Sequence, residues 1–290
     1  MSAAQLRSVA TVIGLSVQEG LRKRVFLAVL VLTAGFLALY AFGAYSAFED
    51  VDGFVAGETE ILDPRAFTGA TIFGLAMFAT LFLGAVLAVF LTLGVVRGDA
   101  ESGLLQPIVV RPIGRTTMLI ARFAGAASLS AAYVMLVYAA ACAITAAAGD
   151  WTPDHLVAPA LGLALGVAII AALSLLASTV FSVTAQGIVV FMVFGAGLTA
   201  GLLAQIGQAI NSDSLHEVGR VASWALPFEG LYTASLHALI SETAGLTGVV
   251  LELGPFGGSE AAGPELIAWA FAYLLGVLAL AAFVFSRRDL

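Results

Sequence analysis

The sequence of 290 residues is strongly apolar and weakly acidic. Hydrophobic residues make up 61% of it and charged residues 11%, and the mean hydropathy is +1.04. A soluble globule could not keep so much apolar surface out of water, and the net charge of −7 disfavours a nucleic-acid partner, which would need a basic face. We therefore expect an all-α, polytopic protein of the cell membrane.

The first 24 residues are predicted to form an interfacial amphipathic helix. Their basic cluster follows the apolar positions instead of preceding them, unlike a secretory signal peptide. A basic topology anchor with a frayed lead-in is the alternative interpretation. The apolar positions that recur at helical spacing are Leu6, Val9, Ala10, Ile13, Val17 and Leu21.

Six apolar runs are long enough to cross about 30 Å of hydrocarbon, which takes about 20 residues as a helix. The second and third exceed that length, so we expect tilt or helix that continues past the bilayer surface. No ionisable residue lies well inside any run, which disfavours an ion-driven carrier, because such carriers keep charges at membrane depth. The runs are Phe26–Tyr45, Ala66–Val96, Met118–Ala148, Leu156–Phe181, Gly187–Ile210 and Leu266–Phe285.

The distribution of basic residues predicts the orientation of these runs. Ten of the twelve Lys and Arg residues fall on one side, and Arg65 and Arg220 fall on the other. Basic residues near span ends stay in the cytoplasm far more often than not. We therefore expect both termini and residues 97–117 to be cytoplasmic, and residues 211–264 to lie outside.

No catalytic motif or metal site is visible in the sequence. The only lysine, Lys23, is not preceded by the glycine pattern of a phosphate-binding loop. The three histidines, His155, His216 and His237, are too scattered to suggest a metal site. We expect a protein that is not an enzyme and holds no cofactor, so energy for any transport would come from outside the bilayer.

The connection between the second and third runs, residues 97–117, is predicted to be cytoplasmic and yet is moderately apolar. Asp99 and Glu101 stand where a short helix would begin, a position at which the helix dipole favours acids. Pro107 and Pro112 prevent that helix from continuing into the next run. From the residues alone, the apolar side chains could contact a partner or pack against the protein's own helix ends. These side chains are Leu104, Leu105, Ile108, Val109 and Val110.

The runs ESGLL at 101–105, RPIGR at 111–115 and MLIAR at 118–122 together resemble the cytoplasmic signature of type-2 ATP-binding-cassette permeases. Leu104 stands where threonine is usual in that signature, and Pro107 where an apolar residue is usual. In such families the segment is a coupling helix that docks in a groove of a separate ATPase subunit, and two permeases work with two ATPases. The resemblance implies ATPase-coupling roles for Asp99, Glu101, Gly103, Leu104, Leu105, Pro112 and Arg115.

The resulting hypothesis is a single permease domain over residues 1–290. It would be one subunit of an ATP-driven exporter, surrounded by membrane lipid and paired with a second permease copy. A non-transporting membrane scaffold or assembly factor is the alternative. The substrate cannot be read from the sequence, because polar side chains such as Ser174, Ser178 and Gln205 suit lipids, peptides and drugs alike.

Two further features concern helix packing in the second half of the chain. The segment 211–264 is predicted to form short helices on or dipping into the outer leaflet, and packing over the span ends is favoured over a gating role. Gly162 with Gly166, and Gly197 with Gly201, match the small-xxx-small spacing of closely packed helices. We expect both pairs to serve packing within the chain.

Overall fold

The computed structural model describes residues 14, 17–22, 24–54, 63–94, 115–210, 212–240 and 263–287. This part of the chain contains helices and no strand, which confirms the all-α prediction. Six of the helices are long and apolar enough to cross a membrane, as expected. They are α2 (Arg24–Phe54), α3 (Pro64–Thr92), α5 (Arg115–Gly149), α6 (Val157–Val180), α7 (Val183–Ala209) and α11 (Pro264–Ser286); the two shorter ones are α8 (Asp213–Ala225) and α9 (Pro227–Ile240).

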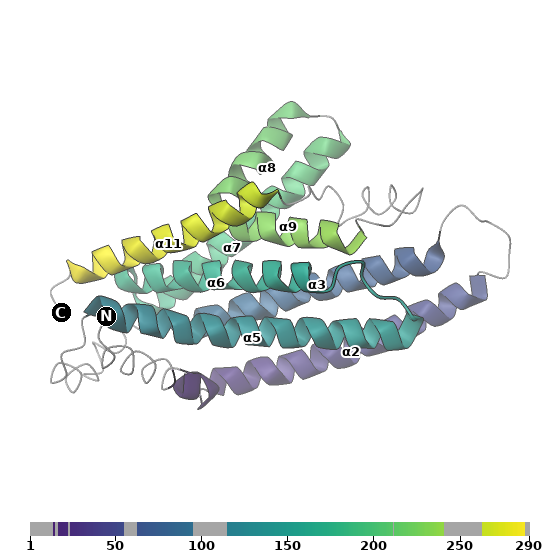
Figure 1. Ribbon diagram of the computed structural model, residues 1–290, viewed down its shortest axis with the longest axis horizontal. Helices are drawn as coiled ribbons and strands as arrows, with labels where there is room; N and C mark the ends of the chain where they lie inside the picture. The colour runs from purple at the N-terminus through teal and green to yellow at the C-terminus, as the bar shows by residue number, and fades with distance from the viewer. Residues whose placement is uncertain are drawn as a thin grey trace.

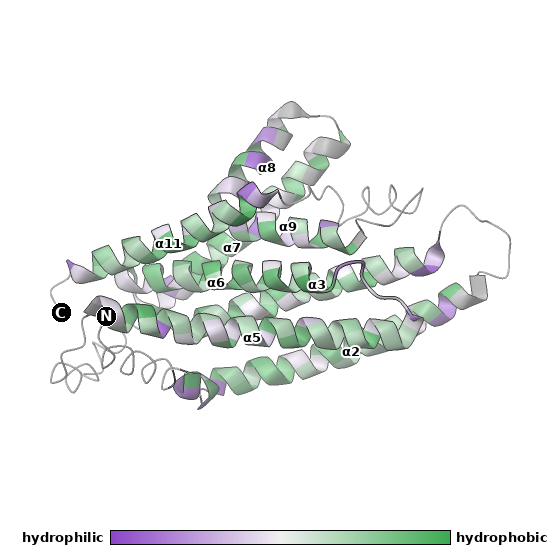
Figure 2. Ribbon diagram, in the orientation of Figure 1, coloured by the Kyte–Doolittle hydropathy of each residue, from purple (hydrophilic) through white to green (hydrophobic). Residues whose placement is uncertain are grey.

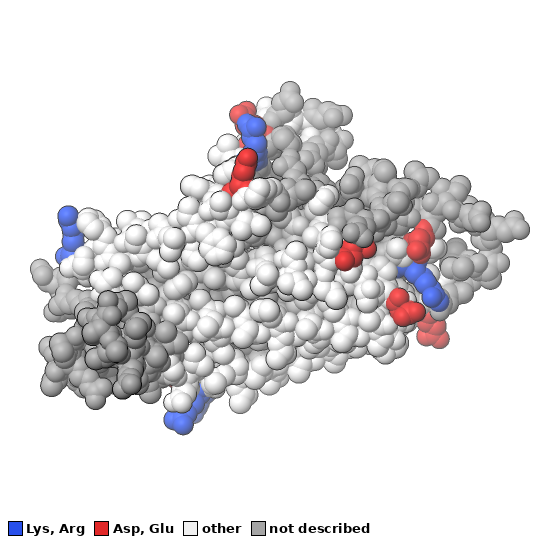
Figure 3. Space-filling view, viewed as in Figure 1, with Lys and Arg blue, Asp and Glu red and all other residues white. Residues whose placement is uncertain are grey.

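The long helices lie roughly along one axis and define two ends of the molecule (Figure 1). The basic end carries the start of α2, the end of α3, the start of α5, the α6–α7 turn and the end of α11. The acidic end carries the α2–α3 connection and the α5–α6 turn. Apolar residues cover the length between the two ends (Figure 2), and acidic groups gather around the acidic end (Figure 3). This separation is what a membrane-spanning bundle requires.

Two helix boundaries differ from the sequence expectation at the acidic end. Helix α2 continues nine residues beyond the expected Tyr45, to Phe54, because the drop in hydropathy marks the end of the apolar run and not the end of the helix. Phe48 in this extension is buried, and its ring packs on Gly149 of α5. Helix α3 begins at Pro64, where the Asp63 carboxylate accepts hydrogen bonds from the next backbone N–H groups at 3.0 and 3.2 Å.

The centre of the bundle is formed by α3 and α6. About two-thirds of the most apolar stretch of each is buried, against about one-sixth for α2 and α11. At Gly84 of α3, an added Cβ would clash with Val134 of α5 and lie 3.0 Å from Val167 of α6. Glycine therefore allows the three helices to meet closely, which is how membrane helices gain packing energy where no hydrophobic effect drives them together.

Polar bonds add to the packing between α2 and α5. The Thr33 hydroxyl is bonded to the Tyr133 hydroxyl, and one level further along the Tyr40 hydroxyl is bonded to that of Thr145. All four residues are buried. Hydrogen bonds between membrane helices contribute roughly 0.6 kcal/mol each on average. These two pairs therefore fix the register of α2, which otherwise exposes most of its surface.

Candidate functional site

The residues predicted to couple to an ATPase lie at the basic end. Positions 99, 101, 103, 104, 105 and 112 fall outside the described residues, so their roles remain predictions. Arg115 is the first residue of α5. The predicted segment lies between Gly94, just after α3, and Arg115, at the start of α5. The structure describes both of these positions.

A buried glutamine holds the end of α3 in place. The Gln186 side chain, from the first turns of α7, is fully buried. Its Oε1 accepts a hydrogen bond from the Gly94 N–H at 3.1 Å, and its Nε2 donates to the Thr92 carbonyl at 3.1 Å. The same Nε2 donates to the carbonyl and the Oγ of Ser174 in α6, at 3.0 and 3.1 Å. We call Gln186, Thr92, Gly94 and Ser174 the glutamine clamp.

The glutamine clamp satisfies backbone groups that the end of a helix leaves unpaired. The Thr92 carbonyl belongs to the last turn of α3, and Gly94 has a positive φ of 70°, a conformation that glycine adopts without steric cost. The Thr92 hydroxyl also donates to the Ser174 Oγ at 2.8 Å, so every side chain in the group is bonded to another. If the Gln186 amide were flipped, its NH₂ group would face the Gly94 N–H and its oxygen would face the carbonyls of Thr92 and Ser174. Neither pair could form a hydrogen bond, so the orientation of the amide is fixed.

The sequence analysis missed this clamp because it placed the start of the fifth run at Gly187. Helix α7 begins four residues earlier, at Val183, and so includes Gln186. The low hydropathy of glutamine excluded it from the apolar run, although its bonds with α3 and α6 let it lie in a buried position. One polar side chain at the start of an apolar run is the only signal that the sequence offered.

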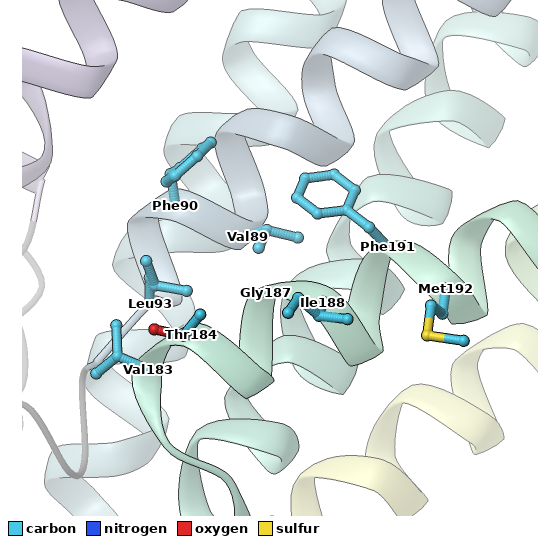
Figure 4. Close-up of a pocket in the computed structure, with 9 residues that line it drawn as sticks. All are labelled: Val89, Phe90, Leu93, Val183, Thr184, Gly187, Ile188, Phe191 and Met192. Carbon is cyan, nitrogen blue, oxygen red and sulfur yellow. The ribbon is translucent and has the colours of Figure 1, made fainter.

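An apolar groove of about 620 Å³ lies between α3 and α7 beside the glutamine clamp (Figure 4). Thr184 carries the only polar side chain among its lining residues. Beyond the groove, towards the acidic end, Phe82 of α3 contacts Phe194 of α7, with ring centroids 6.2 Å apart. The groove therefore lies in the half of the α3–α7 seam nearest the basic end. Its lining residues are Val89, Phe90, Leu93, Val183, Thr184, Gly187, Ile188, Phe191 and Met192.

The N-terminal segment also contacts the bundle at the basic end. Residues 17–22 are helical, and Gly20 is buried where an added Cβ would meet Leu91 of α3 and Leu129 of α5. Glu19 forms an ion pair with Arg122 of α5 at 3.7 Å. The described contacts are thus made through Gly20 and Glu19, neither of which was on the predicted apolar face. Whether residues 1–24 form an interfacial amphipathic helix stays a prediction, because positions 1–13 lie outside the described residues.

A family model described as ABC-2 family transporter protein matches residues 10–290, nearly the whole chain. The chain belongs to the ABC-2 family. The family prediction made from the sequence is therefore confirmed. No curated protein gives a significant match to the chain.

Membership of the ABC-2 family makes the chain the permease component of an ATP-binding-cassette transporter. ABC-2 permeases work with ATP-binding-cassette subunits and are membrane components that normally are not catalytic themselves. Within the described residues, no group of three or more His, Cys, Asp or Glu side chains could hold a metal ion.

Between α8 and α11, the ABC-2 chain packs the short helix α9 along α6. The backbone N–H of Asp154, before α6, donates to the Leu239 carbonyl near the end of α9 at 3.5 Å. Phe228, at the start of α9, packs on Gly166, nine residues into α6. At 1.5 Å per residue, α9 therefore begins about 14 Å deeper than the acidic-end terminus of α6. Short helices that lie on or dip into the outer leaflet stay a prediction, which the packing of α9 along α6 supports.

Both glycine pairs form the surface on which α9 packs. Gly162 and Gly166 of α6 face Ser235 and Phe228 of α9, whereas Gly197 and Gly201 of α7 face Phe228 and Glu229. The expected role of the pairs in packing within the chain is therefore confirmed. Figure 1 shows α8 and the adjoining end of α7 standing away from the other helices, with α9 passing beneath them.

Glu229 is a buried acidic residue that the sequence analysis did not find. Only 5% of the residue is exposed, and its carboxylate packs against Gly201. Burial raises its pKa to about 7 from 4.5. The sequence search for membrane-embedded charges covered only the six runs, and it did not include Glu229 because α9 lies outside them. Its place in the first turn of α9 favours the anion, but burial dominates the pKa.

The structure places the three predicted pathway residues differently from one another. Ser174 belongs to the glutamine clamp, and Ser178 is buried with its hydroxyl donating to the Leu175 carbonyl. Neither faces an open passage in this structure. The side chain of Gln205 lies outside the described residues. The described groove is lined by α3 and α7 residues that the sequence analysis had not selected.

Proposed function

We propose that this ABC-2 permease is the membrane subunit of an exporter and couples to a separate ATPase through residues 97–117. The observation that carries the proposal is the family match over nearly the whole chain, together with the fixed ends of α3 and α5 on either side of the segment. The clamp sets where the chain leaves α3. The permease itself hydrolyses no nucleotide in this scheme.

Two features of the groove support export as the direction. It lies at the basic end, which the charge distribution predicts to be cytoplasmic. Towards the acidic end, the ring of Phe194 contacts the rings of Phe82 and Phe228. The centroids of Phe194 and Phe228 are 5.7 Å apart. An apolar or amphipathic substrate could therefore enter from the cytoplasmic leaflet and meet a closed seam further out. The lipid-facing surface carries exposed apolar residues such as Leu39 and Phe42.

The functional unit is expected to contain two copies of this chain, or this chain and a second permease, with two ATPase subunits. Mass measurement of the complex purified in nanodiscs checks the stoichiometry, and ATP-dependent exchange of a fluorescent phospholipid across proteoliposomes checks a transport activity. A stable, ATP-hydrolysing assembly with one copy of the chain and no second permease would contradict the proposal. A complex that binds no ATPase would favour the membrane scaffold or assembly factor instead.

Orientation gives a second test of the proposed function. In a Cys142→Ala background, Thr116→Cys should be protected from a membrane-impermeant maleimide in intact cells, and Gly57→Cys should react. The expected result follows from the basic residues at the end where α5 begins. Reaction at position 116 together with protection at position 57 would reverse the topology and place both termini outside.

A further inference from the structure

We propose that Gln186 is a positioning residue that links the end of α3 to the wall of the groove. The inference rests on the proposed ATPase coupling, since it concerns how a movement at residues 97–117 reaches the membrane-spanning helices. In this scheme the amide of Gln186 makes the end of α3 and the first turns of α7 move together.

The position of Gln186 on α7 supports this link. Thr184 and Gly187, on either side of it, line the groove (Figure 4). Leu93, directly after α3, lines the same groove and lies between two residues that Gln186 binds, Thr92 and Gly94. Displacing the end of α3 would therefore either pull α7 with it or break the amide bonds.

The bonds of Gln186 to Thr92 and Ser174 are hard to break, because these groups are buried. Thr92 and Ser174 are 1% and 0% exposed, and Gln186 is 0% exposed. A buried donor or acceptor that loses its partner keeps the full cost of having left water. A linked displacement of α3 and α7 preserves the bonds of Gln186 with Thr92 and Gly94, so it is favoured over separation of these two helices.

The bond to Ser174 gives the link a fixed reference point. Ser174 lies in α6, one of the two central helices, and its carbonyl and hydroxyl both accept from Gln186. The ends of α3 and α7 are thus held against the helix that also packs on α9. The buried Thr80 of α3 has no such link, because its hydroxyl donates to the carbonyl of Ala76 within its own helix.

The test measures how nucleotide changes the groove, so it needs no knowledge of the substrate. Ile188, which lines the groove and is 57% exposed, is replaced by cysteine in a Cys142→Ala chain. The complex with its ATPase is labelled with a maleimide, with and without ATP plus vanadate. We expect trapping to change the labelling rate by about fivefold or more in this parent, a typical size for coupling between sites.

Gln186→Met is expected to reduce that change to less than about twofold while the ATPase remains bound, because methionine keeps the side-chain volume and loses the hydrogen bonds. Thr80→Val is the matched control: it removes a buried hydroxyl from α3 and should leave the parental change intact. An undiminished change in Gln186→Met, or an equal loss in Thr80→Val, would overturn the inference.

Three further outcomes are distinguishable. If Gln186→Met does not assemble in the membrane, Ser174→Ala provides the test, since it removes one hydrogen-bond acceptor of Gln186 without adding volume. Ser174→Ala should reduce the change in labelling rate. An undiminished change in this variant overturns the inference. If the parent binds no ATPase, the proposed function fails and takes the inference with it. If the parent shows the expected change and the clamp variants do too, only the inference fails.

Discussion

Leu105→Asp is expected to abolish stable binding of the ATPase subunit. The substitution would place a carboxylate in the apolar contact predicted for residues 97–117. Losing an apolar anchor at the centre of an interface costs on the order of 2 kcal/mol or more, which corresponds to about a 30-fold weaker complex. Glu101→Arg should act in the same direction, because it places a cation at the expected start of a helix. Co-purification of the ATPase with the tagged permease measures both effects.

Two controls separate loss of docking from loss of folding. Neither Leu105 nor Glu101 belongs to one of the six apolar runs of the sequence, so both variants should insert and give the parental thermal unfolding profile. Glu58→Arg reverses a charge in the α2–α3 connection and should leave the ATPase bound. Normal ATPase binding and stimulation in both variants would mean that the segment packs on its own bundle, and the proposed docking site would be lost.

Glu229→Gln is expected to stabilise the permease at pH 8 and to have little effect at pH 5. The pKa of Glu229 is raised from 4.5 to about 7, so the native state binds the proton more tightly than the unfolded state. Stability contributed by this group is therefore fully present below about pH 4.5, falls as the pH rises to about 7, and stays low above it. A shift of this size corresponds to about 3 kcal/mol.

Thermal unfolding midpoints in nanodiscs, measured from pH 5 to pH 8, provide the test. Glu265→Gln is the matched control, because Glu265 also lies in the first turn of a helix and is exposed. The Glu265 variant should follow the parent at every pH. The same small difference between Glu229→Gln and the parent at pH 5 and at pH 8 would show that Glu229 does not titrate in a buried position. Such a result would argue against the packing of α9 on α7.

Part of the fold could be predicted because it depends on the composition of local segments and on the spacing of residues within them. Six apolar runs predict six membrane-spanning helices, since only a helix satisfies its own backbone in lipid at that length. The glycine pairs at 162 and 166 and at 197 and 201 predict close packing, because small residues admit a neighbouring helix. The family signature at residues 101–122 predicted a relationship that the family match confirms.

Other features could not be read from the runs, because they depend on which helices meet. Hydropathy placed the end of the second run at Val96 and the start of the fifth at Gly187. The structure ends α3 at Thr92 and starts α7 at Val183, where one amide serves both helix ends. Likewise, the extension of α2 beyond Tyr45 is held by the contact of Phe48 with Gly149.

The sequence by itself determined that this protein is all-α with six membrane-spanning helices, because those properties follow from local composition, and the signature at residues 101–122 carried its resemblance to ABC permeases. Only the tertiary structure decided that Gln186 binds the end of α3 and that Glu229 is buried against Gly201. From the sequence alone, a glutamine and a glutamate are expected to be exposed. Burial is a property of the neighbours that the fold brings together, and here those neighbours are about 90 positions away for Gln186 and 28 for Glu229.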